Sequence, residues 1–476
     1  MEEVKTEGQK LQELLSFKQE TVWDKFTDED VKKAFDFSEE YKAFLDASKT
    51  EREFTANAEK AALDAGFISL EKLLKEDKKL APGTKVYFIN KKKSAVFAVI
   101  GKQPLSEGTN ILGAHIDSPR LDLKQNPLYE DINFALFKTH YYGGIKKYQW
   151  LTLPLAIHGV VFKGDGTKVN IVIGENDDDP VFTITDLLPH LAQEQMSKKM
   201  NEFITGEGLN VLLGSMPYKD EKVKEKVKLN ILSILYKRYG IVEKDFQSAE
   251  LEIVPAQKAR DVGFDKSMIG AYGHDDRVCA YPALRAIFAQ DIPERTSICL
   301  LTDKEEIGSA GNTGAQSQVL QDFIANLISL TDDYSSLKLR ACLTNSKMLS
   351  ADVNAAVDPN YDNVFEKNNA TYLGRGIAVQ KYTGSRGKYD ASDANAEFLA
   401  ELRKLFDDNN IVWQTGELGK VDIGGGGTIA MYDANLGIEV VDCGLAVLSM
   451  HSPFEIISKM DLYAMLNAYK VFYTMK

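Results

Sequence analysis

The chain has 476 residues, more than one hydrophobic core usually supports, so two domains are expected. Hydrophobic residues make up 44% of it and charged residues 27%, a balance typical of a soluble globular protein. The formal net charge of -13 argues against nucleic acid or an anionic membrane surface as a partner. No apolar run is long enough to span a bilayer, and the first residues show no apolar secretory segment. We therefore expect a cytoplasmic protein.

The first quarter of the chain combines helices with a few strands. Residues 1–80 are rich in Lys, Glu, Ala and Leu at the spacing of solvated amphipathic helices. Apolar runs then predict strands at residues 85–90, 94–100 and 110–115. From about residue 120 the composition shifts toward proline, aromatic and β-branched residues, and this pattern predicts short strands, among them residues 151–157, 168–173 and 251–254.

After about residue 256, apolar strands alternate with amphipathic helices. The predicted strands include residues 296–302 and 437–441, and the predicted helices are residues 275–290, 319–330, 394–407 and the C-terminus from 461. Such alternation implies a mainly parallel sheet with helices on both faces. We therefore predict an α/β fold in which residues 1–119 and 256–476 form one domain and residues 120–255 are a β-rich insertion.

The four cysteines are scattered and include no Cys-x-x-Cys pair. Three of them lie in apolar contexts, which is typical of buried reduced thiols in a cytosolic protein. A thiolate zinc site is therefore not expected among Cys279, Cys299, Cys342 and Cys443.

Two adjacent carboxylates, Glu305 and Glu306, follow the predicted strand 296–302. Burying both is costly unless a positive charge lies beside them, and a divalent metal ion is the usual solution. One carboxylate would then bind the ion, while its neighbour could act as a base on water. The alternative is ordinary, because Glu-Glu pairs are also common on solvated helices.

Four further segments carry ligand-type residues at the ends of predicted elements. Ligands in open α/β sheets bind outside the carboxyl ends of strands, so these side chains are expected at one edge of the sheet. Nitrogen and oxygen ligands without cysteine suit zinc, manganese or cobalt. The candidates are His115 with Asp117, Asp275, Asp352 and His451.

Each of these residues also has a structural interpretation. Asp117 could cap a turn before Ser118 and Pro119, and Asp352 could form an Asx-turn. Asp275 and Asp276 could be no more than helix-starting carboxylates. His451 could be a core histidine whose ring nitrogens are satisfied by neighbours.

Taken together, the motifs resemble the aspartyl aminopeptidase family of dinuclear metallopeptidases along nearly the whole chain, and more closely its bacterial branch. The main motifs are His115-x-Asp117, Gly273-His-Asp-Asp-Arg277, Glu305-Glu-Ile-Gly308, Ser350-Ala-Asp352 and Met450-His-Ser-Pro453. Three further stretches also look like this family: Tyr141-Tyr-Gly-Gly144, Leu155-Ala-Ile-His-Gly159 and Lys381-Tyr-Thr-Gly-Ser-Arg-Gly387.

The resemblance implies a zinc-exopeptidase-like catalytic domain that binds two divalent ions per subunit, zinc first, with cobalt or manganese as alternatives. His115 and Asp352 would bind one ion, Glu306 and His451 the other, and Asp275 would bridge both. Asp117 would orient the imidazole ring of His115 through the ring nitrogen that does not bind the ion. Glu305 would be the general base and acid, with water activated by the two ions attacking the first peptide bond.

The resemblance also assigns roles to two further residues, one in substrate binding and one at the contact between subunits. Lys381 would lie near the substrate and could pair with an acidic N-terminal residue, whereas a solvated loop lysine is the alternative. His158 would reach a neighbouring subunit's active site to bind substrate and stabilise the oxyanion, whereas a surface histidine is the alternative. The insertion would mediate dimerisation, and the dimers would build a closed homo-oligomer, typically a dodecamer.

The expected function is thus removal of the N-terminal residue from peptides with a free N-terminus, with an expected preference for Asp or Glu. Two other functions stay open. One is a related dinuclear peptidase or deacylase that acts on other substrate ends. The other is a metal-stabilised assembly protein without catalysis, against which Glu305 argues because no ligand role requires it.

Overall fold

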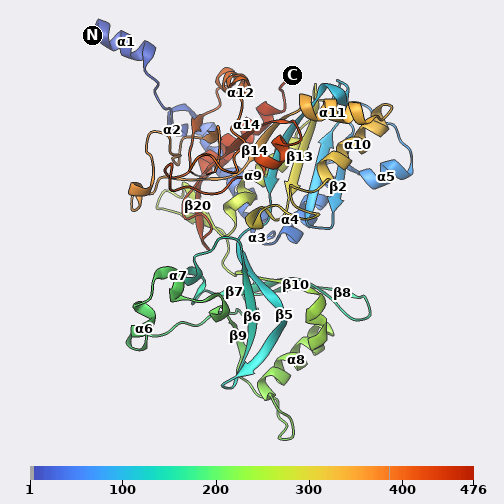
Figure 1. The fold of residues 1–476 in the computed structure, drawn as a ribbon, viewed down its shortest axis with the longest axis vertical. Helices are drawn as coiled ribbons and strands as arrows, with labels where there is room; N and C mark the ends of the chain where they lie inside the picture. The colour runs from blue at the N-terminus through green and yellow to red at the C-terminus, as the bar shows by residue number, and fades with distance from the viewer. Residues whose placement is uncertain (1–4, 385) are drawn as a thin grey trace.

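The computed structural model describes residues 5–384 and 386–476, and in Figure 1 they form two bodies that meet at a narrow junction. One body holds a nine-stranded sheet with helices around it, and the other holds a six-stranded sheet. The polypeptide leaves the first body at the start of β5 (Arg120–Asp131) and returns to it after β10 (Ala249–Pro255).

The nine-stranded sheet is parallel at its centre and mixed at its edges. Its four central strands, in spatial order, run parallel: β13 (Thr296–Thr302), β4 (Thr109–His115), β14 (Lys347–Ala351) and β18 (Glu439–Gly444). The hairpin of β2 (Lys85–Asn90) and β3 (Ser94–Val99) joins β13 in antiparallel fashion, with β1 (Ile68–Ser69) outside it. On the other side β16 (Ile377–Gln380) is antiparallel to β18 and pairs with β17 (Trp413–Thr415). The predicted, mainly parallel α/β fold is confirmed.

Helices cover both faces of this sheet because its strands are apolar on both sides. In β3, Phe97 contributes to one core cluster and its neighbour Val96 to the other. The first face is covered by α3 (Asp28–Asp46), α4 (Glu51–Asp64), α9 (His274–Phe288), α12 (Ala396–Asp408) and α14 (Lys459–Phe472). The second is covered by α5 (Leu70–Lys75), α10 (Val319–Thr331), α11 (Ser336–Asn345) and α13 (Ala430–Ala434).

The six-stranded sheet is antiparallel and has its own core. Its spatial order is β8 (Lys168–Ile173), β7 (Leu155–Phe162), β10, β5, β6 (Phe134–Tyr142) and β9 (Val211–Gly214). Helix α8 (Lys226–Tyr239) packs against it through Ile231, Leu232 and Leu235. The short helices α6 (Gln193–Met196) and α7 (Met200–Phe203) lie in the segment between β8 and β9.

Smaller elements complete the first body. A three-stranded sheet is formed by β11 (Arg260–Val262), β12 (Met268–Ala271) and β20 (Glu455–Ser458), and a two-stranded one by β15 (Asn354–Ala355) and β19 (Ala446–Val447). The N-terminal helix α1 (Glu7–Leu15) extends away from the body, and α2 (Val22–Lys25) follows it. In the described part of the chain, no helix is long and apolar enough to cross a membrane.

Two sequence expectations can be settled from these elements. The strand predicted at 151–157 begins only at Leu155, because Pro154 has no N–H to donate to a ladder and the preceding residues form a short 3-10 turn ending at Trp150. The cysteine prediction is confirmed: Cys279, Cys299, Cys342 and Cys443 are all buried and unbridged.

Candidate metal centre

The predicted ligand residues meet at the carboxyl ends of the central parallel strands. His115 is the last residue of β4 and lies opposite Thr302, the last residue of β13. Glu305 and Glu306 follow in a 3-10 turn directly after β13, and Asp352 follows β14. This is the edge where open α/β sheets bind ligands, and the strand register alone brings three of the segments together.

Asp275 lies between two histidines. Its Oδ1 is 3.2 Å from His115 Nε2, and its Oδ2 is 3.2 Å from His451 Nε2. The two oxygens of one carboxylate therefore face two different imidazole nitrogens. A carboxylate in this position can bind two ions at once.

Each histidine has a second carboxylate within reach. Asp352 Oδ1 lies 3.8 Å from His115 Nε2, and Glu306 Oε2 lies 3.7 Å from His451 Nε2. Ligand atoms of Asp275, Glu306 and His451 all lie within 4.8 Å of one another, as do those of His115, Glu305 and Glu306. We call Asp275, Glu305, Glu306, Asp352, His115 and His451 the metal cluster.

The orientation of both imidazole rings leaves Nε2 directed at the metal cluster. His115 Nδ1 lies 3.0 Å from the backbone oxygen of Asp117, and His451 Nδ1 lies 2.9 Å from the backbone oxygen of Gly144. A carbonyl oxygen only accepts, so Nδ1 carries the proton in each ring and donates it. In the metal-free protein Nε2 can also carry a proton and donate it to Asp275, and a metal ion that displaces that proton binds the Nε2 lone pair.

The metal cluster holds more buried negative charge than its own side chains neutralise. Burial, followed by repulsion from Asp117 and Asp275, raises the pKa of Glu305 to about 7. Burial also raises the pKa of Glu306 and of Asp352 well above the usual range, with Asp275 adding to the shift in Glu306 and Asp276 to that in Asp352. Burial would raise the pKa of Asp275 too, but hydrogen bonds from His115 and His451 hold it far below its ordinary value.

The donor set fits a divalent cation. Glu306 Oε1 is buried without a hydrogen-bond partner, although buried carboxylate oxygens normally have one. Carboxylate oxygens and imidazole nitrogens without thiolates suit zinc, manganese or cobalt in a catalytic site. Bound cations would relieve the repulsion that raises the carboxyl pKa values.

Asp117 holds the turn that carries the two glutamates. Its Oδ1 accepts a hydrogen bond from the backbone N–H of Glu305 (3.1 Å), and its Oδ2 accepts one from that of Glu306 (3.2 Å). The same carboxylate lies 3.4 Å from His115 Nδ1, through Oδ1. Asp117 is therefore in contact with His115 and with the glutamate turn, as the sequence analysis expected of an orienting group.

Glu455 was missed by the sequence analysis. Its carboxylate accepts hydrogen bonds from the backbone N–H groups of His451 (2.7 Å) and Asp275 (3.0 Å), so it ties two ligand segments together. Glu455 is buried and opens β20. The available signal was an acidic residue at the head of an apolar strand, four positions after the candidate ligand His451.

Asp276 is more than a helix-starting carboxylate. It is fully buried, both of its carboxylate oxygens are without a hydrogen-bond partner, and it lies within 4.8 Å of the ligand atoms of His115 and Asp352. Asp275 and Asp276 have non-helical backbone dihedrals, so regular α9 geometry begins only at Arg277. Asp276 is therefore a further oxygen donor near the His115 side of the metal cluster.

His158 is not brought to the metal cluster. It lies in β7, is buried, and its Nδ1 and Nε2 contact Glu53 (2.7 Å) and Glu175 (3.0 Å) of its own chain. Burial opposes the charged ring, but the two glutamates raise its pKa. Within this single chain both ring nitrogens face glutamates and the ring is buried, so His158 is not a surface histidine, and its role at a neighbouring active site stays a prediction.

Lys381 is half-exposed and contacts Asp393, with 2.6 Å between Nζ and Oδ1. It lines a cavity of about 450 Å³ together with Tyr382, Thr415 and Glu417, and no residue of the metal cluster lines that cavity. The structure therefore does not bring Lys381 into contact with the predicted ligands.

Comparison with known proteins agrees with this geometry. A family model described as aminopeptidase I zinc metalloprotease (M18) matches residues 44–473. A Clostridium acetobutylicum protein named "Probable M18 family aminopeptidase 1" is 54% identical over 451 residues, covering 95% of this chain and 97% of that protein. The crystal structure of an M18 family aminopeptidase from Thermotoga maritima is similar at a TM-score of 0.91 and 46% identity, covering 96% of this chain and 99% of that chain.

A more distant structure shares the fold alone. The yeast mApe1 dodecamer is similar at a TM-score of 0.74 and 22% identity, covering 92% of this chain and 96% of that chain. The family model and the bacterial relatives, by contrast, extend over nearly the whole chain, including every segment of the metal cluster. The chain therefore belongs to the M18 family of zinc metalloaminopeptidases, the aspartyl aminopeptidases.

Proposed function

We propose that this chain binds two divalent ions and uses them to remove the N-terminal residue from peptides with a free N-terminus. The observation that carries the proposal is the position of Asp275, whose two oxygens each lie 3.2 Å from a different histidine nitrogen. His115 and Asp352 would complete one site, and His451 and Glu306 the other. Zinc is the expected ion, with cobalt or manganese as alternatives.

Two ions at these residues would supply an electrophile for the peptide carbonyl and bring the pKa of a water molecule toward neutrality. Glu305 is the residue that moves the proton. Its Oε2 lies 3.9 Å from His115 Nε2, at the edge of the metal cluster, and it is not needed as a ligand. It would accept the proton of the attacking water and then deliver it to the leaving amine.

The chain's own residues would keep Glu305 in place during this transfer. The backbone N–H groups of Glu305 and of the adjacent Glu306 both donate to the Asp117 carboxylate. A base that is held at one distance from the reacting water does not have to be reoriented in each cycle, which lowers the barrier.

A panel of aminoacyl-nitroanilides, tested with metal-reconstituted protein, checks the proposed activity. Substrates with a free α-amine should be hydrolysed, and the same substrates with an acetylated amine should not. Hydrolysis of blocked substrates alone would favour a related deacylase or a different peptidase. Absence of turnover on every substrate, with metal bound, would favour an assembly protein.

A preference for N-terminal Asp or Glu is the finer part of the proposal, and it rests on Lys381. The ammonium group of Lys381 is paired with Asp393, so a substrate carboxylate would have to take the place of Asp393 as its partner. The same panel tests this preference through the ratio of kcat/KM for Asp and Glu substrates to that for Ala and Leu substrates.

Assembly into a homo-oligomer, through an insertion spanning residues 120–255, is also part of the proposal. The insertion exposes large apolar side chains in one segment: Leu187, Leu188, Leu191, Met196 and Met200. Exposed apolar patches of this kind mark interaction surfaces, and the fold relative from yeast was solved as a dodecamer.

His190 is exposed within this segment, whereas His158 is buried, so His190 is better placed to reach a partner. Light scattering at low micromolar concentration tests assembly, and an active monomer would contradict it.

A further inference from the structure

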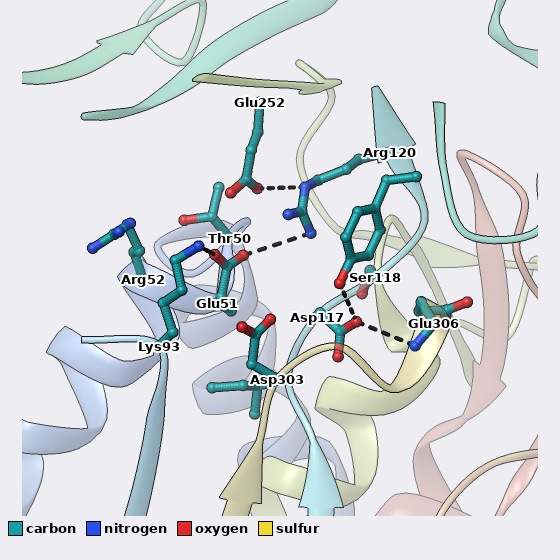
Figure 2. Close-up of polar contacts among 12 residues, drawn as sticks. Thr50, Glu51, Arg52, Lys93, Asp117, Ser118, Arg120, Glu252, Asp303 and Glu306 are labelled. Carbon is teal, nitrogen blue, oxygen red and sulfur yellow. Dashed lines mark hydrogen bonds and ion pairs between the residues drawn. The ribbon is translucent and has the colours of Figure 1, made fainter. Parts of the chain in front are cut away.

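Tyr142 of β6 belongs to the six-stranded sheet, yet its side chain reaches the catalytic turn. Its hydroxyl donates a hydrogen bond to Asp117 Oδ2 at 2.8 Å. The same Asp117 carboxylate accepts the backbone N–H groups of Glu305 and Glu306. Figure 2 shows Asp117 beside Glu306, with a dashed line from the Asp117 carboxylate to the backbone nitrogen of Glu306.

The segment after Tyr142 also lies against the metal cluster. A Cβ on Gly143 would lie 3.1 Å from Glu306 Oε2, and a Cβ on Gly144 would lie 3.3 Å from His451 Nδ1. The backbone oxygen of Gly144 accepts the hydrogen bond from His451. The end of β6 is therefore packed directly on two of the ligands, and at Gly143 both the close contact and a φ of +74° favour glycine.

Arg120, the first residue of β5, fixes the tyrosine ring from behind. Its guanidinium carbon lies 3.9 Å from the ring centroid of Tyr142, within the range of a cation–π contact. Arg120 is itself buried, and its Nε lies 3.0 Å from Glu252 Oε2 and 2.9 Å from Asp122 Oδ1.

A set of buried charges continues from Arg120 into the other body. Glu51 of α4 lies 3.6 Å from Arg120 Nη1 and 3.6 Å from the ammonium group of Lys93, which is in the turn between β2 and β3. We call Glu51, Lys93, Arg120 and Glu252 the junction cluster (Figure 2), because two of its members come from each body. The ring of Tyr142 is thus held between the junction cluster and Asp117.

We propose that Tyr142 is a positioning residue: held by Arg120, it fixes the Asp117 carboxylate and thereby the turn that carries Glu305. This inference rests on the proposed function, because it takes Glu305 as the general base. It gives the six-stranded sheet a role inside each active site, separate from any role in assembly. Tyr142 does not touch the substrate or the reacting atoms in this scheme.

The test compares Tyr142→Phe with Tyr141→Phe. The first variant removes only the hydroxyl and keeps the ring on which Arg120 lies. The second removes the hydroxyl of the neighbouring, exposed tyrosine on the same strand, for which no contact with Asp117 is present. Loss of a group that orients a metal ligand typically lowers activity by about 10–100-fold. We expect kcat of Tyr142→Phe to fall in this range with KM little changed, and Tyr141→Phe to match the wild type.

Two further measurements separate positioning from a purely structural role. In protein loaded with cobalt(II), the visible absorption band reports ligand geometry, and it should shift in Tyr142→Phe but not in Tyr141→Phe. In a Glu305→Gln background, adding Tyr142→Phe should cause almost no further loss of kcat, because both changes act on the same proton transfer.

A lower unfolding midpoint for Tyr142→Phe with unchanged kcat and an unchanged cobalt spectrum would overturn the positioning role. So would an equal loss of kcat in the wild-type and Glu305→Gln backgrounds. If Glu305→Gln itself retained full activity, the proposed base would be wrong, and that failure is visible without the tyrosine variants.

Discussion

Two clusters of buried charge lie on either side of Tyr142, and they differ in how their charge is balanced. The junction cluster pairs two carboxylates, Glu51 and Glu252, with two cations, Lys93 and Arg120. The metal cluster has four carboxylates and two histidines but no lysine or arginine in its described contacts. With neutral histidines its carboxylates carry a formal charge of -4, which two divalent ions would balance.

Glu51 of the junction cluster and Glu306 of the metal cluster show a contrast, although burial also raises the pKa of Glu252 in the junction cluster well above its usual range. Glu51 is fully buried, and burial alone would raise its pKa, but Arg120 and Lys93 hold the pKa below its ordinary value. Glu306 is equally enclosed, and its pKa is raised well above the usual range, because burial and Asp275 act in the same direction. A buried cluster that contains its own cations is a structural element, whereas one that lacks them is arranged to receive them from solution.

The largest expected effect is on catalysis at the metal cluster. Glu305→Gln keeps the shape of the side chain but cannot accept a proton, so kcat should fall by about 10²–10⁴ while both ions stay bound. Glu306→Gln is the matched change one residue later and should instead weaken one ion, with activity partly restored by excess metal. Steady-state kinetics with elemental analysis check both variants. Loss of metal in the first and retention in the second would reverse the two roles.

The next effect concerns stability at the junction cluster. Arg120→Met removes the cation that Glu51 and Glu252 share, and breaking a buried pair in this way typically costs about 3–5 kcal/mol of unfolding free energy. Lys102→Met is the control, since it breaks the exposed pair with Glu294, for which about 0–1 kcal/mol is expected. Urea unfolding measures both. Similar small losses in the two variants would mean that the junction cluster is no more important than a surface pair.

Metal removal should destabilise the protein through the other cluster. At an ion concentration of 100 times Kd, binding to the folded state adds about 2.7 kcal/mol per site to the unfolding free energy, so a chelator should remove that increment and lower the unfolding midpoint. Lys102→Met should retain the full metal-dependent increment, because its exposed pair with Glu294 belongs to neither cluster. An unfolding midpoint insensitive to chelation would count against ion binding at the metal cluster.

Metal affinity should rise with pH. Burial opposes a charged His451, but the hydrogen bond that its ring donates to Asp275 and the charge of Glu306 raise its pKa to about 10 in the metal-free protein. Below that pH the ring is protonated, and an ion must displace the proton, so affinity should increase roughly tenfold per pH unit for each proton released. Calorimetry in buffers of different ionisation enthalpy counts those protons. His140→Gln, a change at an exposed histidine, should leave the count unchanged.

The smallest effect is expected at Lys381, whose pair with Asp393 is exposed and belongs to neither cluster. Lys381→Met should lower kcat/KM for Asp and Glu substrates by roughly 5–30-fold, the scale of one partly solvated charge-assisted contact, and leave Ala and Leu substrates unaffected. An equal loss on all substrates would remove Lys381 from the specificity pocket.

The ligand residues could be predicted from sequence because they follow the strands that the apolar runs reveal. His115 ends β4, Glu305 and Glu306 follow β13, and Asp352 follows β14, so a parallel sheet places them at one edge. Residues that only hold the ligand segments in place do not follow the ends of the central strands in this way. Glu455 lies far in the chain from Asp275, and Tyr142 lies 25 residues from Asp117, so their roles depend on which N–H group or carboxylate meets them in space.

His158 shows what the alternation of side chains along a strand can and cannot predict. The pattern predicts which face of β7 the ring lies on, but not that Glu53 from α4 and Glu175 from the turn after β8 would enclose it. The same applies to Asp276, which the sequence allowed to be no more than a helix-starting carboxylate. Its burial comes from the close packing of α9 beneath the metal cluster.

The central claim is that Asp275 bridges two ions, and anomalous diffraction from crystals grown with zinc tests it most directly. Data collected on both sides of the zinc absorption edge should give two strong peaks per chain. One should lie between His115 and Asp352, the other between His451 and Glu306, with the Asp275 carboxylate between the peaks. A single peak in the zinc-saturated protein, or two peaks of which neither is in contact with Asp275, would contradict the account.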